Sequence, residues 1–176
     1  MPKKHPVSLD AIKALRAKTS ASLNDVRQAL ESAGGDEAKA LELLRQRGAQ
    51  IAETRQGRAT GQGRIESYVH HDGRIGALVE VNCETDFVAR TQEFIQFCRD
   101  VAMHIAAMSP RYVRSEDLPG SAGLNPEEVK ALCLLEQPFV KDPGATVGDL
   151  LKSLIAKTGE NVVIRRFEQF VVGETS

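Results

Sequence analysis

The apolar residues of this chain change their spacing once along the sequence, and that change limits the folds the chain can adopt. In the first 50 residues they recur at helical intervals, as in Leu9, Ile12 and Leu15. From Arg64 to Cys83 they alternate with polar neighbours, which is the period of a strand with one buried face. The sequence therefore predicts an α+β fold, with a small antiparallel sheet packed against helices.

Residues 1–50 are predicted to form three short helices. Ser8 can cap the first, and Ser22 with Asp25 makes a capping box before the second. Asp36 can cap the third, which we expect to end at Gly48. Helices this short are unstable alone and must bury their faces against one another. A compact three-helix domain follows, similar to a ubiquitin-associated domain.

Residues 51–63 are predicted to be a linker or an exposed arm. The apolar periodicity disappears there, and glycines alternate with arginines. The segment lacks the G-K-[ST] ending of a phosphate-binding loop, so we expect no phosphate site in it.

Residues 64–176 are predicted to form an α+β core domain. Its first part is a β-hairpin that turns at residues 71–74, and a long helix is expected to open at residues 84–87. A helix capped by Asn125, a turn at residues 142–144, a helix capped by Thr146 and a last strand complete it.

Composition and charge place the chain among soluble globular proteins of the cytoplasm. It has 41% hydrophobic and 27% charged residues, with no apolar run long enough to span a membrane and no apolar segment behind its N-terminal lysines. The net charge is −1, but Met1 to Arg64 holds 12 Lys and Arg against 7 Asp and Glu. Such a basic region suits binding to an acidic protein surface, and RNA is the second candidate partner. The simplest alternative is a basic face that is only exposed to solvent.

No residue pattern typical of catalysis or metal binding is present. The sequence lacks the nucleophile elbow, the zinc-protease motif, the dinucleotide fingerprint and the kinase motifs, so we expect a binding protein that needs no cofactor rather than an enzyme. His70 and His71 are neighbours and would point to opposite faces of a strand, so no metal site is predicted. Cys83, Cys98 and Cys133 are far apart and are expected to be buried free thiols.

Four segments resemble the elongation factor Ts family, in the order in which that family has them. They are residues 15–30, residues 80–90 (E-V-N-C-E-T-D-F-V-A-R), residues 135–140 and residues 158–161 (T-G-E-N). The likeness spans nearly the whole chain. It implies a guanine nucleotide exchange factor that promotes GDP release from the GTPase elongation factor Tu.

The resemblance also implies which residues meet the GTPase. Residues Thr85 to Val88 would act at the nucleotide site, where Asp86 and Phe87 wedge into the G domain and loosen the Mg²⁺ site. Leu15, Arg16 and Leu23 of the N-terminal domain would contact a neighbouring helix of the G domain. From spacing alone, Asp86 would be a helix cap and Phe87 a core residue, while Leu15 and Leu23 would be core residues and Arg16 solvated.

Longer family members duplicate the core, and this chain resembles the short bacterial forms. The resemblance therefore implies a homodimer, in which a second copy supplies the missing half. The alternatives are a ubiquitin-type adaptor, a small enzyme without a recognisable motif, and an RNA-binding factor. Direct nucleic-acid or membrane binding is not expected.

Overall fold

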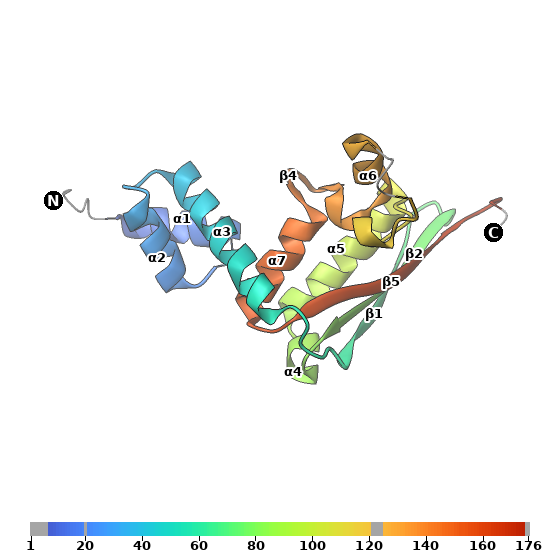
Figure 1. Ribbon diagram of the computed structural model, residues 1–176, viewed down its shortest axis with the longest axis horizontal. Helices are drawn as coiled ribbons and strands as arrows, with labels where there is room; N and C mark the ends of the chain where they lie inside the picture. The colour runs from blue at the N-terminus through green and yellow to red at the C-terminus, as the bar shows by residue number, and fades with distance from the viewer. Residues whose placement is uncertain (1–6, 20, 121–124, 175–176) are drawn as a thin grey trace.

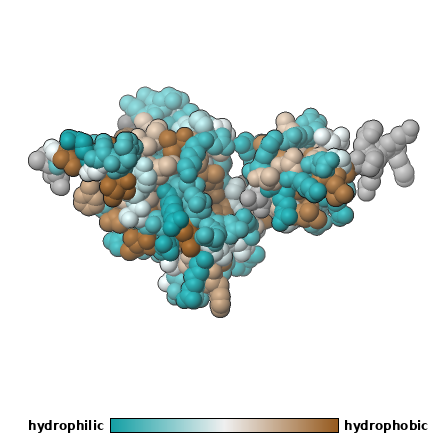
Figure 2. Space-filling model, turned by 180° about the vertical axis from the view of Figure 1, so that it is seen from behind, coloured by the Kyte–Doolittle hydropathy of each residue, from teal (hydrophilic) through white to brown (hydrophobic). Residues whose placement is uncertain are grey.

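The computed structural model describes residues 7–19, 21–120 and 125–174, and it shows a helical N-terminal unit joined to an α+β core. The N-terminal unit consists of α1 (Leu9–Thr19), α2 (Leu23–Ser32) and the first half of α3 (Glu37–Arg55). The space-filling view shows it as a smaller lobe, set apart from the larger core by a narrow waist (Figure 2). The predicted α+β class is confirmed.

The predicted helix starts in the N-terminal unit are confirmed. The hydroxyl of Ser22 accepts a hydrogen bond from the Asp25 amide at 3.1 Å, and the Asp36 carboxylate accepts one from the Lys39 amide at 3.1 Å. The Ser8 hydroxyl accepts from the first turn of α1 in the same way. The three helices enclose a small core of their own, made of Ile12, Leu15, Val26, Ala29, Leu30 and Ala40.

The prediction that the third helix ends at Gly48 is wrong. Helix α3 continues to Arg55, so the segment without regular structure is shorter than the predicted linker of residues 51–63. Gly48 is buried, and a Cβ atom added to it would lie 3.7 Å from the Cβ of Ala156 in α7 (Val147–Thr158). Glycine costs about 1 kcal/mol in a helix interior, but α3 continues through Gly48 because its packing against α7 stabilises the helix.

The core contains a three-stranded antiparallel sheet in the order β1-β2-β5. The strands are β1 (Gln62–Val69), β2 (Ile75–Cys83) and β5 (Val162–Val171), and a β-bulge interrupts the β2–β5 pairing beside Glu80 and Val81. The predicted hairpin and last strand are therefore confirmed. At the hairpin turn, the His70 amide donates to the Ile75 carbonyl at 2.8 Å, and Gly73 has a φ of 69° that suits glycine.

One face of the sheet packs against α5 (Gln92–Met108), and α7 lies beside α5 (Figure 1). Alternate residues of β2 face the helices, so Ala77, Val79, Val81 and Cys83 are buried. Phe94 and Val101 of α5 meet them and are fully buried. Cys83, Cys98 and Cys133 are free and buried, as predicted.

A second, two-stranded sheet follows α6 (Pro126–Leu132) and the short helix η3 (Leu134–Glu136) in the chain. It pairs β3 (Pro138–Phe139) with β4 (Asp142–Thr146), so the residues predicted as a turn at 142–144 are strand instead. The predicted caps of α6 and α7, Asn125 and Thr146, are confirmed as capping boxes. Within the described ranges, no helix is long and apolar enough to cross a membrane.

Candidate partner-binding site

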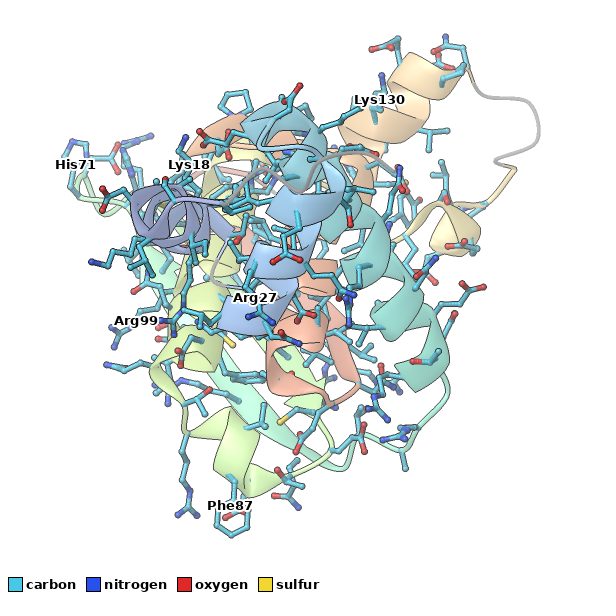
Figure 3. All side chains as sticks on the ribbon, turned by 90° about the vertical axis from the view of Figure 1, so that its left-hand side faces the viewer. Lys18, Arg27, His71, Phe87, Arg99 and Lys130 are labelled. Atoms are coloured by element: carbon cyan, nitrogen blue, oxygen red, sulfur yellow. The ribbon has the colours of Figure 1, made fainter. Side chains whose placement is uncertain are left out.

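Phe87 is the most exposed large apolar side chain in the described part of the chain. It lies on α4 (Asp86–Ala89), a single turn between β2 and α5, and 81% of its surface is exposed. Figure 3 shows its ring projecting from the end of the core, away from the other labelled side chains. An aromatic ring held in water without a packing partner is costly, so the position favours contact with another molecule.

The prediction of one long helix from residues 84–87 is wrong. Helix α4 ends at Ala89, and α5 begins again at Gln92 with its own cap, because the Thr91 hydroxyl accepts a hydrogen bond from the Phe94 amide at 3.3 Å. Phe87 therefore stands on a separate helical turn at a corner of the chain. The stiffness of this turn cannot come from a continuous helix behind it.

Hydrogen bonds to the turn between α7 and β5 hold the corner instead. The carboxylate of Glu160 accepts from the Thr85 amide at 3.0 Å and from the Thr85 hydroxyl at 2.6 Å. Conversely, the carboxylate of Glu84 accepts from the Asn161 amide at 2.7 Å. Two carboxylates thus tie two backbone segments together, and hydrogen bonds to charged groups are about twice as strong as neutral ones.

The side chain of Asn161 extends this network to the segment between α3 and β1. Asn161 is buried, and its amide group donates to the Arg58 carbonyl at 2.8 Å. The guanidinium of Arg58 in turn lies 3.5 Å from the Glu84 carboxylate. The segment between α3 and β1 is thereby fixed to the same corner as Phe87.

Thr85, rather than Asp86, is the cap of α4. The Thr85 hydroxyl accepts from the Val88 amide at 3.4 Å, while the Asp86 carboxylate pairs with Arg90 at 2.9 Å on the surface. Val88 is half-buried and packs on the core. The interpretation from spacing, with Asp86 as cap and Phe87 in the core, is therefore wrong in both parts.

The N-terminal residues separate into one core residue and two surface residues. Leu15 is fully buried among the three helices, as spacing alone indicated, and so it is not on the surface that a partner would meet. Leu23, at the start of α2, is 57% exposed, and Arg16 is exposed on α1. Arg16 and Leu23 are thus accessible to a partner, whereas Leu15 supports the helix that carries Arg16.

Among the described residues around Phe87, the Cys83 thiol is not activated as a nucleophile and no metal ligand set is present. Burial raises the pKa of the Cys83 thiol to about 11, and this thiol donates to the Thr85 carbonyl at 3.1 Å. A thiol with a raised pKa is a poor nucleophile at neutral pH. Among the residues that the structure describes, no three His, Cys, Asp or Glu side chains gather closely enough to hold a metal ion.

Sequence reasoning missed the contribution of Glu160 and Asn161. Both lie in the T-G-E-N segment, which resembled the family but had received no role. Their contact with residues 84 and 85 joins positions more than 70 residues apart, so no local pattern could reveal it. The sequence contained one indication of this contact: residues 80–90 and residues 158–161 both resemble the same family.

Comparison with known proteins gives one consistent result. A family model described as "Elongation factor TS" matches residues 7–130. A protein of Rubrobacter xylanophilus named "Elongation factor Ts" is 47% identical, over 92% of this chain and 97% of its own length. Proteins with the same name from Carboxydothermus hydrogenoformans and Thermotoga petrophila are 45% and 43% identical, each over 96% of this chain.

Proposed function

Because this chain belongs to the elongation factor Ts family of translation elongation factors, we propose that it is a guanine nucleotide exchange factor for the GTPase elongation factor Tu. The observation that supports the proposal best is Phe87, an exposed aromatic ring on a corner that is fixed by charged hydrogen bonds. The protein itself would change no covalent bond and need no cofactor.

The mechanism follows from how a GTPase holds its nucleotide. Backbone amides, a lysine and Mg²⁺ surround the phosphates of GDP, so GDP leaves slowly unless this arrangement is disturbed. A protein that binds the disturbed state more tightly than the GDP-bound state shifts the population toward it. Phe87 would insert between elements of the G domain, and Asp86 beside it would disfavour the geometry that holds Mg²⁺.

A rigid support is needed for this kind of insertion. If the corner moved when the ring met the GTPase, the binding energy would deform the exchange factor instead of its partner. The contacts of Glu84 and Glu160 fix the residues just before α4 to the turn between α7 and β5 and meet this need. Thr85 and Val88 would act as support rather than as the surface that enters the partner.

The N-terminal unit would dock on a neighbouring helix of the G domain through Arg16 and Leu23. Both are exposed, and they belong to a domain whose sequence is basic on balance. An exposed charge of this kind acts mainly on the association rate.

Release of fluorescent GDP from elongation factor Tu tests the proposal. Catalytic amounts of the protein should speed both GDP release and GDP loading and leave the equilibrium between them unchanged. A protein without effect at micromolar concentration would contradict the exchange function. A pull-down that retained ubiquitin and not the GTPase would favour the adaptor alternative.

We also propose that the protein forms a homodimer through the outer face of its sheet. Ile65, Val69, Leu78 and Phe170 are 65%, 67%, 43% and 63% exposed, and the strand register brings Val69 and Phe170 to either side of Gly76. A sheet face with this much exposed apolar surface is unusual for a monomer. A second copy of the same face would cover it with apolar residues of the same kind.

Light scattering measures the oligomeric state directly. The wild-type protein should have the mass of a dimer at tens of micromolar, and Phe170→Glu should shift it to a monomer without unfolding it. A wild-type monomer with full exchange activity would contradict the dimer.

A further inference from the structure

A cleft of about 380 Å³ lies between the N-terminal unit and the core. Lys13, Arg16 and Ala17 of α1 line one wall, and Glu93 of α5 and Lys157 of α7 line the other. The residues on α1 are three and four positions apart, so they share one face of the helix, beside the face that Ile12 and Leu15 bury. The cleft therefore combines side chains from two units with separate cores.

The charges in the cleft are unbalanced. The Lys157 ammonium lies 2.9 Å from the Glu93 carboxylate, and this hydrogen bond holds the pKa of Glu93 below its usual range. These two charges offset each other. Lys13 and Arg16 add two positive charges, and neither forms an ion pair within the part of the chain that the structure describes. An anionic group in the cleft would relieve their repulsion.

One wall of the cleft lies close to Phe87 along the chain. Glu93 lies in the first turn of α5 and Phe87 in α4, only six residues earlier in the chain. Six residues span at most about 22 Å, so Glu93 on the cleft wall is near enough for one protein to contact it and Phe87 together. A cleft of this volume takes a few side chains rather than a nucleic-acid helix, and the chain as a whole carries a net charge of −1.

We propose that this cleft receives a carboxylate-bearing segment of the same partner that meets Phe87, and that Lys157 and Lys13 belong to the contact surface together with Arg16. The inference rests on the proposed exchange function. Lys157 has a double role in it: in the free protein it pairs with Glu93, and in the complex it turns toward the carboxylates of the partner. Glu93 then weakens binding in two ways, because it holds Lys157 and repels the incoming acid.

If the cleft binds the partner in this way, removing either member of the Lys157–Glu93 ion pair should change the association rate, in opposite directions. Lys157→Ala should lower the second-order rate constant for association with elongation factor Tu about threefold at low salt, and less at high salt. Glu93→Gln should raise the same constant about twofold, because the cleft gains one net positive charge. If the ion pair only stabilised the fold, both variants should lower the association rate constant. The maximal rate of GDP release at saturation should stay at the wild-type value, since Phe87 is untouched.

Lys152→Ala is the matched control, because Lys152 is an exposed lysine on the same helix that does not line the cleft. The rates are measured by stopped-flow release of fluorescent GDP at several salt concentrations. If wild-type protein releases GDP while Lys157→Ala behaves as Lys152→Ala, or if Glu93→Gln slows association, the cleft has no such role and the exchange function stands. If wild-type protein releases no GDP, both proposals are overturned together.

Discussion

The N-terminal unit and the Phe87 corner present their exposed residues in different ways. In the N-terminal unit, Arg16 lies on a helix surface, and the fold behind it is held by a small apolar core. At the corner, Phe87 stands on a single turn, and the fold behind it is held by charged hydrogen bonds to a distant segment. A charge that attracts a partner tolerates a mobile side chain, whereas a ring that deforms a partner needs a fixed base.

The largest effect is expected from Phe87→Ala. Exchange activity should fall tenfold or more, because truncating an aromatic hot spot costs about 2 kcal/mol or above. The free protein should lose little stability, since the ring is 81% exposed. GDP-release kinetics and a thermal melt of the free variant measure the two quantities.

Phe94→Ala is the matched control for that comparison. Phe94 is fully buried in the core, so its truncation should cost about 3–5 kcal/mol of stability. A folded Phe87→Ala protein with normal exchange, or one that melts as Phe94→Ala does, would show that the corner is not the functional site.

Thr85→Val tests whether the corner must be rigid. It removes the hydroxyl that donates to Glu160 and accepts from the Val88 amide, at an expected cost of about 1–2 kcal/mol. Exchange should fall several-fold although Phe87 is unchanged. Thr85→Ser keeps the hydroxyl and should restore most of the activity. Equal activity of the two variants would mean that the support of α4 is unimportant.

Acid should weaken the core and spare the N-terminal unit. His104 is buried, its Nδ1 accepts from the Val140 amide at 3.2 Å, and its Nε2 lies 2.9 Å from the Gln137 side-chain oxygen. Burial lowers the pKa of His104, so the unfolded chain takes up the proton first as the pH falls below the ordinary value of about 6.5. The stability due to neutral His104 is complete above that pH and decreases below it.

Urea unfolding at pH 8 and pH 5.5 measures this loss. The decrease should be smaller in His104→Gln, and His71→Gln, which changes an exposed histidine at the hairpin turn, should behave as wild type. The described part of the N-terminal unit contains no histidine, so its own unfolding should not show this dependence. The same acid dependence in both regions would contradict the assignment to His104.

The smallest effect is expected from Arg16→Ala. Association with elongation factor Tu should slow about twofold at low salt, with a difference that shrinks as salt rises. Maximal exchange should not change. Lys39→Ala, which removes an exposed charge elsewhere in the unit, is the control. An effect of Arg16→Ala that is independent of salt would indicate a packing role instead of an electrostatic one.

Features set by neighbouring residues were predictable from the sequence. The caps at Ser22, Asp36 and Thr146 depend on an amide three residues away, and each is present. Gly48 was misread as a helix end because a glycine alone does not stop a helix that packs on another: α3 continues past Gly48 and lies against Ala156 of α7. The break between α4 and α5 was missed for a related reason, because the apolar spacing runs on through Thr91 and hides a second cap.

The candidate site was predictable only in part. The exposure of Phe87 contradicts what spacing indicates for an aromatic residue beside a helical apolar stripe, and only resemblance to a family pointed to a surface role. The support from Glu160 depends on how α7 and β5 meet β2, which no local pattern contains. Leu15 is the opposite case: spacing indicated a core residue, and the structure places it there.

Helix α3 sets how the N-terminal unit is rotated relative to the core. Its first half belongs to the N-terminal core, and its second half packs on α7 through Gly48 and on the main core through Ala52. With 19 residues it is about 28 Å long, and each residue added near its middle would rotate the N-terminal unit by about 100° about the helix axis. One inserted residue would turn Arg16 away from Glu93 and Lys157, which lie across the cleft from it. Seven inserted residues, close to two full turns, would restore its direction and add about 10 Å of separation. In a series of insertions between Leu44 and Gly48, the association rate should therefore rise and fall with the period of the helix, and a steady decline with length would show that α3 acts only as a tether.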